Sequence, residues 1–225
     1  MKKVINKALH FTNDRCLLPV ANRFKKNYEK YYFNKLRKEL KNKDFSLFSP
    51  NCYAGLIYHR LGLQFNSPTI NLCFPIKKHY LKFVSNIRYY LSKDLIFIND
   101  PEYTCPVAML EDIKIVFNHY DTNENAKSSW DKRKQRVNYD NVFIIFDDIA
   151  DVEYSDLLAF NSISCKGKVI LTAKKYENLQ NTVQIIRYKK TEKMNAYLLD
   201  KNIWTGKNVA DKNFNFVKWL NTSKI

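Results

Sequence analysis

The sequence predicts an α/β fold, namely a three-layer domain with a mostly parallel β-sheet, preceded by a basic amphipathic N-terminal helix. Short apolar runs typical of strands alternate along the chain with stretches of helical periodicity. One of these runs, Val142–Phe146, is apolar without interruption, as expected of a strand that is buried on both faces. A chain of 225 residues, of which 45% are hydrophobic, is long enough to bury the core of one good-sized domain.

Residues 21–43 are expected to form the N-terminal helix. This stretch has nine basic and two acidic residues. Aromatic or aliphatic side chains recur in it at every fourth position, at Phe24, Tyr28, Tyr32, Leu36 and Leu40. Such a helix can lie on an anionic membrane surface, or it can pack against the domain with its basic face in solvent. We therefore divide the chain into an N-terminal helical extension, residues 1–44, and a single α/β domain, residues 45–225.

The elements of the domain follow from the same patterns. Strands are predicted at residues 45–49, 95–98, 113–117, 142–146, 168–172 and 183–188. Helices are predicted at residues 55–61, 80–91, 124–137, 156–160 and 214–220. The alternation of the two kinds of element indicates parallel strands that are joined by helical crossovers.

Charge and glycine content narrow the classes of function. The chain has 38 lysines and arginines against 22 aspartates and glutamates, a net charge of +16. Such an excess favours an anionic partner, for example a nucleic acid, an acidic membrane face or a phosphorylated substrate. The same excess also arises where lysine simply fills solvated positions. The four glycines are not spaced for a dinucleotide-binding turn or a phosphate-binding P-loop.

The cysteines indicate a reducing compartment. There are five of them, and none form a Cys-x-x-Cys pair, so the sequence predicts no zinc ribbon, no redox dithiol and no metal site. The first residues lack the apolar segment of a secretory signal, and the longest apolar run is too short to cross a bilayer. We therefore expect a cytoplasmic protein with reduced thiols.

Ligands of open α/β sheets bind beyond the carboxyl ends of the strands, and this rule selects three segments. The first is the strand-to-helix turn Ser49–Gly55. Cys52 would be a nucleophile there, because the start of a helix lowers the pKa of a thiol, or it would be a small residue that fills the turn. Asn51 would cap the helix or bind a substrate hydroxyl.

The second segment is Asn118–Tyr120, which follows the predicted strand at residues 113–117. His119 is suited to act as a general base at neutral pH, although a histidine at a strand end also serves as a structural hydrogen-bonding group. The third segment is Asp147 and Asp148, after the buried strand. Two adjacent carboxylates can hold Mg²⁺, but the Asp-x-Asp spacing of metal-dependent sugar transferases is absent.

The predicted helix at residues 124–137 carries a further set of candidates. Arg133 and Arg136 are three residues apart, so they would share one helix face, where two guanidinium groups suit a phosphate or a carboxylate. Trp130 lies on the same line and would stack on a sugar or a base. The alternative is a solvated helix whose arginines form ion pairs with neighbouring acidic residues.

Several motifs resemble a bacterial family whose members are commonly labelled exopolysaccharide or capsule biosynthesis proteins. They cover residues 49–59, 61–63, 65–72, 117–120, 130–141 and 218–221, so the resemblance spans roughly residues 45–221. It implies a place in cell-surface polysaccharide assembly. It also adds polar motif residues to the substrate-binding candidates, namely His59, Asn66, Ser67, Asn71, Tyr120, Asn138 and Asn141.

Residues and resemblance together suggest a cytoplasmic transferase that acts on a sugar, with a nucleotide sugar or a coenzyme A thioester as its anionic donor. Cys52 would be the nucleophile and His119 the base, while Arg133 and Arg136 would hold the donor phosphates around one shared cleft. The protein would associate peripherally with the inner face of the plasma membrane through residues 21–43. The alternatives are a basic nucleic-acid-binding module and a non-catalytic, membrane-associated scaffold.

Overall fold

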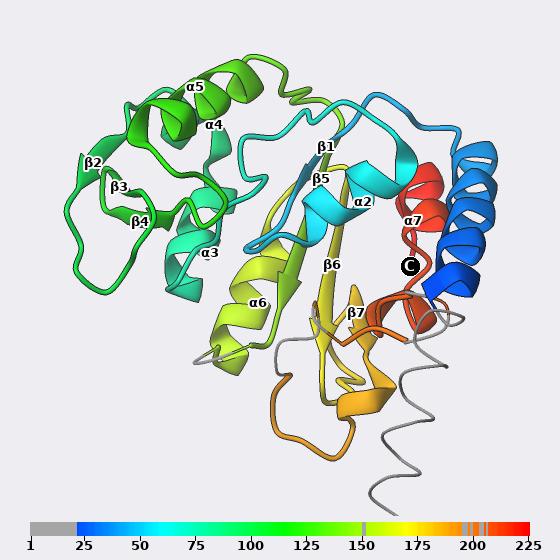
Figure 1. Ribbon diagram of the computed structural model, residues 1–225. Coiled ribbons are helices and arrows are strands. Elements are labelled where there is room, and N and C mark those ends of the chain that lie inside the picture. Colours follow the sequence, from blue (N-terminus) through cyan, green and yellow to red (C-terminus); the bar gives the residue numbers. More distant parts are fainter. Residues whose placement is uncertain (1–21, 150–151, 195–197, 199, 203–204, 206) are drawn as a thin grey trace, which may run out of the picture.

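A computed structural model describes residues 22–225, except for 150–151, 195–197, 199, 203–204 and 206. It contains two β-sheets (Figure 1). The larger sheet is entirely parallel, in the order β1 (Ser46–Phe48), β5 (Val142–Asp147), β6 (Gly167–Thr172) and β7 (Thr182–Gln184). The smaller sheet is antiparallel and consists of β2 (Ile96–Ile98), β3 (Val107–Leu110) and β4 (Ile113–Val116).

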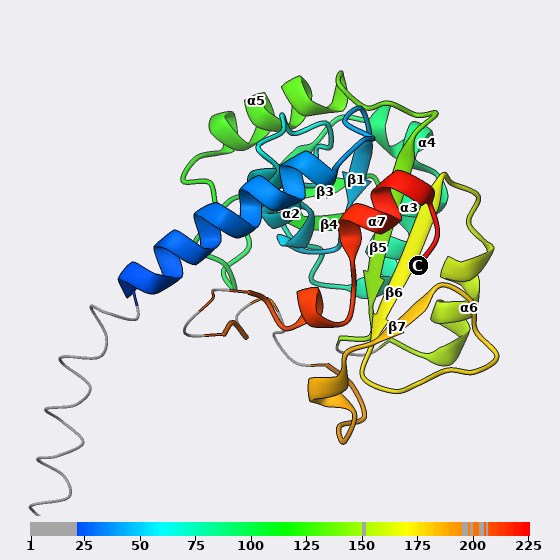
Figure 2. The same cartoon turned by 90° about the vertical axis from the view of Figure 1, so that its right-hand side faces the viewer.

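Helices cover both faces of the parallel sheet, which gives three layers (Figures 1 and 2). The N-terminal helix (22–39), α2 (Tyr53–Leu61) and α7 (Phe216–Thr222) lie on one face, and α3 (Lys77–Ser85) and α6 (Tyr154–Ser162) lie on the other. The central strand β5 serves both cores, because successive side chains of a strand point to opposite faces. Phe143 and Ile145 join the core beneath α2 and α7, whereas Ile144 and Phe146 join the one beneath α3 and α6. The predicted fold class is confirmed.

The N-terminal helix is only partly packed on the domain. Its last turns contribute Leu36, which is buried, and Tyr32 to the core near α7. Its first half extends away from the domain, and Phe24 there is 55% exposed (Figure 2). None of the helices in the described part of the chain has the length and apolar character needed to span a membrane.

Two of the predicted strands belong to the separate antiparallel sheet and not to the parallel one. The strands predicted at residues 95–98 and 113–117 correspond to β2 and β4, and β3, which lies between them, was not predicted from the sequence. A two-residue turn joins β3 to β4, with Leu110 paired to Ile113 and Glu111 at a φ of 55°. Such a turn usually carries glycine or asparagine, so the sequence lacked the ordinary hairpin signal.

The predicted helix at residues 80–91 is two helices. The first, α3, ends at Ser85, and Asn86 then leaves the helical conformation, with φ −147° and ψ 61°. The side chain of Asn86 accepts a hydrogen bond from the backbone N–H of Tyr89 and so caps α4 (Ile87–Leu91). The remaining helix, α5 (Asn123–Lys134), packs over the antiparallel sheet (Figure 1).

An ion pair sealed in the core fixes α2 to the C-terminal part of the chain. Arg60 Nη1 lies 2.8 Å from Asp211 Oδ2, and both side chains are almost fully buried. Tyr53 Oη donates a hydrogen bond of 3.2 Å to the same carboxylate. Both ends of α2 are thus held by one acidic group, which stabilises the helix that begins next to Cys52.

Gly167 tests the packing of the parallel sheet. A Cβ at this position would lie 2.6 Å from the Phe143 ring and 3.3 Å from Trp219 Nε1. Gly167→Ala should therefore lower the free energy of unfolding by about 1–3 kcal/mol, as overpacking of a core does. Denaturant unfolding measures this loss. The exposed neighbour Lys166→Ala is the control and should change stability by less than about 0.5 kcal/mol; equal losses in the two variants would contradict the packing argument.

Candidate functional site

The carboxyl ends of β1 and β5 meet at one edge of the parallel sheet. The turn after β1 carries Asn51, whose Nδ2 donates a hydrogen bond of 2.8 Å to Oδ2 of Asp147, the last residue of β5. The other oxygen, Asp147 Oδ1, is 2.6 Å from Nζ of Lys77, the first residue of α3. Asp147 is fully buried, so its carboxylate is held by these groups rather than by bulk water. This carboxylate ties the turn before α2 to the start of α3.

The first backbone amides of α2 are bonded to side chains of the preceding turn. Tyr53 N donates to Asn51 Oδ1 at 3.0 Å, and Ala54 N donates to Ser49 Oγ at 3.0 Å. We expected the start of this helix to lower the pKa of Cys52, which requires that its first amides are free. These two amides do not meet that requirement, because the chain itself supplies their acceptors.

Cys52 and His119 lie in contact. Cys52 Sγ is 3.3 Å from His119 Nε2, although the two residues come from different sheets of the fold. The segment between them explains the approach. Cys73 forms a β-bridge with Val116 of β4, and the next residue, Phe74, donates its backbone N–H to Pro50 O at 3.0 Å. This short segment therefore lies between the Cys52 turn and the end of β4, and it brings the residues after β4 to the thiol.

Burial raises the pKa of the Cys52 thiol, and a hydrogen bond with the Asn118 side chain opposes the shift. The predicted lowering of this pKa is therefore wrong. Its assumed cause was a free helix N-terminus, but the first amides are occupied and the thiol is largely removed from water. The raised pKa favours the neutral thiol of Cys52, and its Sγ lies next to an imidazole nitrogen, His119 Nε2.

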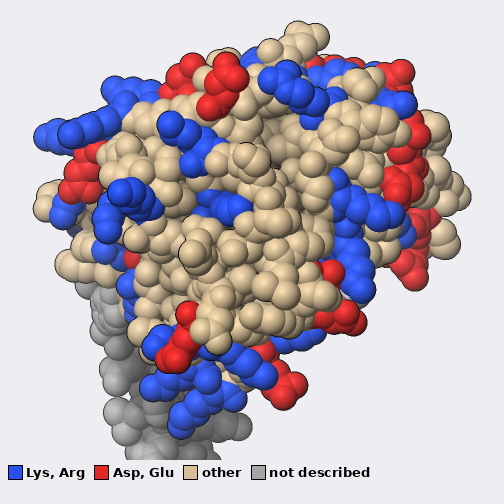
Figure 3. All heavy atoms as spheres, turned by 180° about the vertical axis from the view of Figure 1, so that it is seen from behind, with Lys and Arg blue, Asp and Glu red and all other residues tan. Residues whose placement is uncertain are grey.

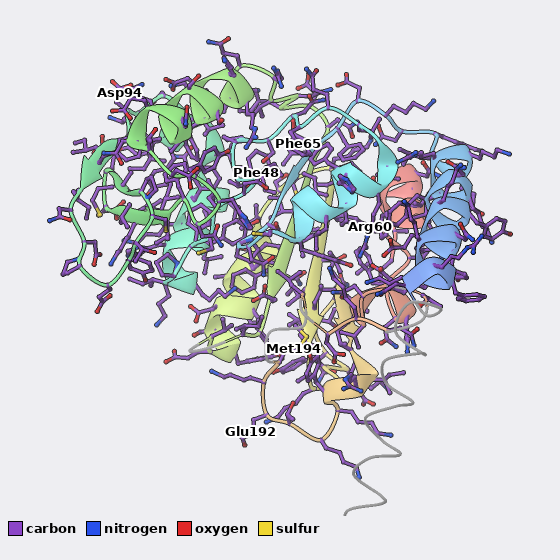
Figure 4. All side chains as sticks on the ribbon, in the orientation of Figure 1. Phe48, Arg60, Phe65, Asp94, Glu192 and Met194 are labelled. Atoms are coloured by element: carbon purple, nitrogen blue, oxygen red, sulfur yellow. The ribbon has the colours of Figure 1, made fainter. Side chains whose placement is uncertain are left out.

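The thiol and the imidazole face a cavity of about 1120 Å³, a size that suits a small-molecule ligand. Its wall is mainly apolar and includes Leu56, Phe65 and Met194, of which Phe65 and Met194 are labelled in Figure 4. Five of the residues singled out from the sequence line this cavity: Asn51, Cys52, His59, Asn71 and His119. The predicted cleft around the cysteine turn and the histidine is therefore present.

Other candidates lie in the core. Trp130 is 1% exposed and packs against Phe83 and Phe117, so its predicted stacking on a ligand is wrong. Ser67 is fully buried, with its hydroxyl 3.0 Å from that of Thr69. The helical spacing of Trp130 marked the buried face of α5 rather than a binding face, because aromatic residues dominate protein cores.

The two arginines do not form a pair. α5 ends at Lys134, so Arg136 lies beyond the helix, is exposed and does not share a helix face with Arg133. Arg133 Nη1 donates to Ile70 O at 2.8 Å and to Tyr120 Oη at 2.7 Å. Neither arginine is among the cavity-lining residues in the part of the chain that the structure describes, so the predicted phosphate clamp is wrong. Arg133 instead fixes the turn that contains His119, through Tyr120.

Asn138 and Asn141 lie at the opposite edge of the sheet. Both precede β5, whereas the cavity lies after it, and parallel strands place these ends on opposite edges. Asn138 Nδ2 donates to Asp44 Oδ2 at 2.9 Å, and Asn141 Nδ2 donates to Asn42 Oδ1 at 2.9 Å. Their predicted contact with the same ligand as Cys52 is therefore wrong. Asn66 also lies outside the lining, among the described residues.

The adjacent carboxylates of Asp147 and Asp148 accept hydrogen bonds from groups of the protein itself. Asp148 accepts hydrogen bonds from Ala173 N at 2.7 Å and Met194 N at 3.1 Å, while Asp147 is bonded as described above. Among the described residues, no three His, Cys, Asp or Glu side chains are grouped as a metal site would require. Sequence reasoning missed Lys77, which lines the cavity beside these groups, because a lysine at a helix start carries no distinctive signal.

Fold and site define an α/β protein with a cysteine–histidine pair at the carboxyl edge of a parallel sheet. The chain matches a family model described as "Domain of unknown function (DUF1919)" over residues 23–221, and it belongs to that family. It is also similar to a protein of Haemophilus influenzae named "Uncharacterized protein". The two are 32% identical over 194 residues, which cover 86% of this chain and 92% of the relative.

The raised pKa of Cys52 predicts how the rate of its alkylation by iodoacetamide depends on pH. Only the thiolate reacts with iodoacetamide, so a raised pKa moves the rise of the alkylation rate to higher pH. In the folded protein the midpoint of this rise should lie at a higher pH than in guanidinium-unfolded protein. Cys73, whose pKa burial raises to about 11, should remain less reactive than Cys52. Peptide mass spectrometry gives each rate, and a folded-state midpoint below that of the unfolded protein would contradict a resting thiol.

Proposed function

We propose that this protein is a thiol-dependent acyltransferase of cell-surface polysaccharide assembly, which moves an acyl group from a coenzyme A thioester to a sugar hydroxyl. The observation that supports this most directly is the 3.3 Å contact between Cys52 Sγ and His119 Nε2 in a ligand-sized cavity. A thiol with an adjacent base is the arrangement that covalent acyl transfer requires.

The proposed reaction has two steps. In the first, His119 Nε2 takes the proton of Cys52 as Sγ attacks the thioester carbonyl. The new S–C bond forms, the bond to the donor sulfur breaks, and the departing thiol takes the proton from His119. In the second, a sugar hydroxyl gives its proton to His119 while its oxygen attacks the acyl carbon. The C–Sγ bond then breaks, and the proton returns to Cys52.

The raised pKa of Cys52 suits this sequence of proton transfers. A thiol that is neutral at rest loses its proton only as it attacks, so it depends on His119 in the same way as a serine nucleophile depends on its base. Arg133 supports the same arrangement indirectly, since it holds Tyr120, the residue after His119.

The sugar acceptor is proposed from the sequence resemblance to proteins labelled for exopolysaccharide or capsule biosynthesis. The motifs that carry this resemblance include the Cys52 turn and the His119 segment. Amide side chains such as Asn71 and apolar groups such as Phe65 line the same cavity. Together they suit a sugar, which combines hydroxyls with apolar ring faces. Glycosyl transfer from a nucleotide sugar is less well supported, because the contact between Cys52 Sγ and His119 Nε2 suits a covalent thioester, which glycosyl transfer does not need.

The acyl-enzyme is the direct test of this proposal. Incubation with a panel of coenzyme A thioesters should add one acyl group to Cys52 and release free coenzyme A, as seen by peptide mass spectrometry and chromatography. Cys52→Ser should remove the thioester adduct. His119→Ala should slow its formation by about 10²–10⁴-fold, the usual contribution of a general base.

Cys165→Ser is the matched control. Cys165 is also a partly buried cysteine, but it precedes β6 at the edge of the sheet away from the cavity. Its variant should acylate at the normal rate. If no thioester acylates Cys52, or if the adduct forms equally fast without His119, the proposed reaction is wrong.

We propose further that the N-terminal helix holds the enzyme peripherally at an anionic membrane face. Phe24 and Tyr31, seven residues apart and therefore on one side of the helix, are 55% and 67% exposed, among several lysines. On the face of the molecule seen in Figure 3, by contrast, basic and acidic side chains are intermixed, which favours a localised contact over a broad basic surface for nucleic acid.

Vesicle flotation tests this contact. The protein should float with vesicles of phosphatidylglycerol and phosphatidylethanolamine and not with pure phosphatidylcholine, and added salt should weaken binding. The variant Phe24→Ser with Tyr31→Ser should lose most of the bound fraction. Tyr89→Ser, which removes an exposed tyrosine from α4, is the control and should bind normally. Equal flotation of all variants would contradict a role for the helix.

A further inference from the structure

We infer that Lys77 is the oxyanion-binding residue of this site, so that the site takes substrates in which attack by Cys52 places negative charge on the oxygen bonded to the attacked carbon. This inference rests on the proposed function, because it names the group that would stabilise the charge formed when Cys52 attacks. In acyl transfer that charge develops on the carbonyl oxygen, and donors aimed at it supply much of the catalysis.

Lys77 is a buried cation in the cavity wall. Its side chain is 9% exposed, and its Nζ lies 2.6 Å from Asp147 Oδ1. An ammonium group has three N–H donors, and within the described part of the chain the structure records Asp147 as its one ionic partner. Two donors therefore remain for a ligand, and the carboxylate balances the positive charge of the lysine in its buried position.

Lys77 and Cys52 are held in one rigid assembly. The carboxylate that binds Lys77 also accepts a hydrogen bond from Asn51, the residue before Cys52. The cation and the nucleophile are therefore both fixed relative to Asp147 before any substrate enters. Such preorganisation is what makes a donor effective, since no reorganisation is needed during the reaction.

Other donors at the cavity are less suitable. The α2 amides of Tyr53 and Ala54 already donate to side chains of the turn. Of the further basic residues of the described wall, His119 is the proposed base, and His59 and Lys201 are exposed, so water and salt screen their charges. Lys77 is the buried basic side chain of the described wall, where a charge-assisted hydrogen bond is strongest.

A pair of alkylating reagents tests the inference without knowledge of the natural substrate. Iodoacetate and iodoacetamide react alike: Sγ bonds to the reagent's carbon, the C–I bond breaks and iodide leaves. They differ in that iodoacetate places a carboxylate next to the attacked carbon and iodoacetamide places a neutral amide there. Lys77→Met should lower the iodoacetate rate at Cys52 about tenfold and change the iodoacetamide rate by less than about twofold, since a hydrogen bond to a charged group is lost.

The controls separate binding from folding. Lys77→Met leaves the Asp147 charge buried and unpaired, so the double variant Lys77→Met with Asp147→Asn, which removes that charge, is measured as well and should show the same selective loss. Lys77→Arg keeps a cation and should restore most of the preference for iodoacetate. In every variant the rate ratio at Cys165, on the far edge of the sheet, should stay unchanged.

The outcomes distinguish this inference from the proposed function. An unchanged rate ratio at Cys52 in Lys77→Met and in the double variant, or an equal fall in both rates, would overturn the role of Lys77 while leaving Cys52 as the proposed nucleophile. A Cys52 that resists both reagents in the unaltered protein would overturn the proposed nucleophile, and the role of Lys77 with it.

Discussion

The buried carboxylate of Asp147 is the interaction on which the candidate site depends. It is removed from water at the end of the central strand, so it must be neutralised and hydrogen-bonded within the protein. Lys77 supplies the charge and Asn51 supplies a further hydrogen bond. Because these partners come from the start of α3 and from the turn before Cys52, the carboxylate determines where both segments lie. Burying such an ion pair is a poor source of stability, and a role in positioning is a better reason for it.

A second constraint joins the two sheets. The bridge between Cys73 and Val116 and the bond from Phe74 to Pro50 hold the antiparallel sheet against the edge of the parallel one. The thiol of Cys52 therefore follows a strand of the parallel sheet, while the imidazole of His119 follows a strand of the other sheet. Neither sheet alone contains both groups, so the site exists only where the two sheets meet.

The sequence predicted only some of the residues that meet at the cavity. Cys52 and His119 were selected as strand-end residues with reactive side chains, and they lie in contact. The predicted ligand contacts of Trp130 and Arg133 are wrong, because the spacing of residues along a helix does not show which face of the helix is buried. The predicted ligand contacts of Asn138 and Asn141 are wrong for a different reason. A motif places residues near one another along the chain, but the direction of β5 separates them from the cavity by the full length of the sheet.

The sequence by itself determined the α/β class, the doubly buried central strand and the positions of most helices, because periodicity and apolar runs are local properties. Only the tertiary structure decided which strands form a second sheet, since hairpin pairing at Glu111 proceeds without the usual turn residues. The tertiary structure also decided the direction in which the pKa of the Cys52 thiol is shifted. Whether a helix start lowers a pKa depends on which groups already occupy its amides and on how much water remains, and both are set by residues distant in the chain.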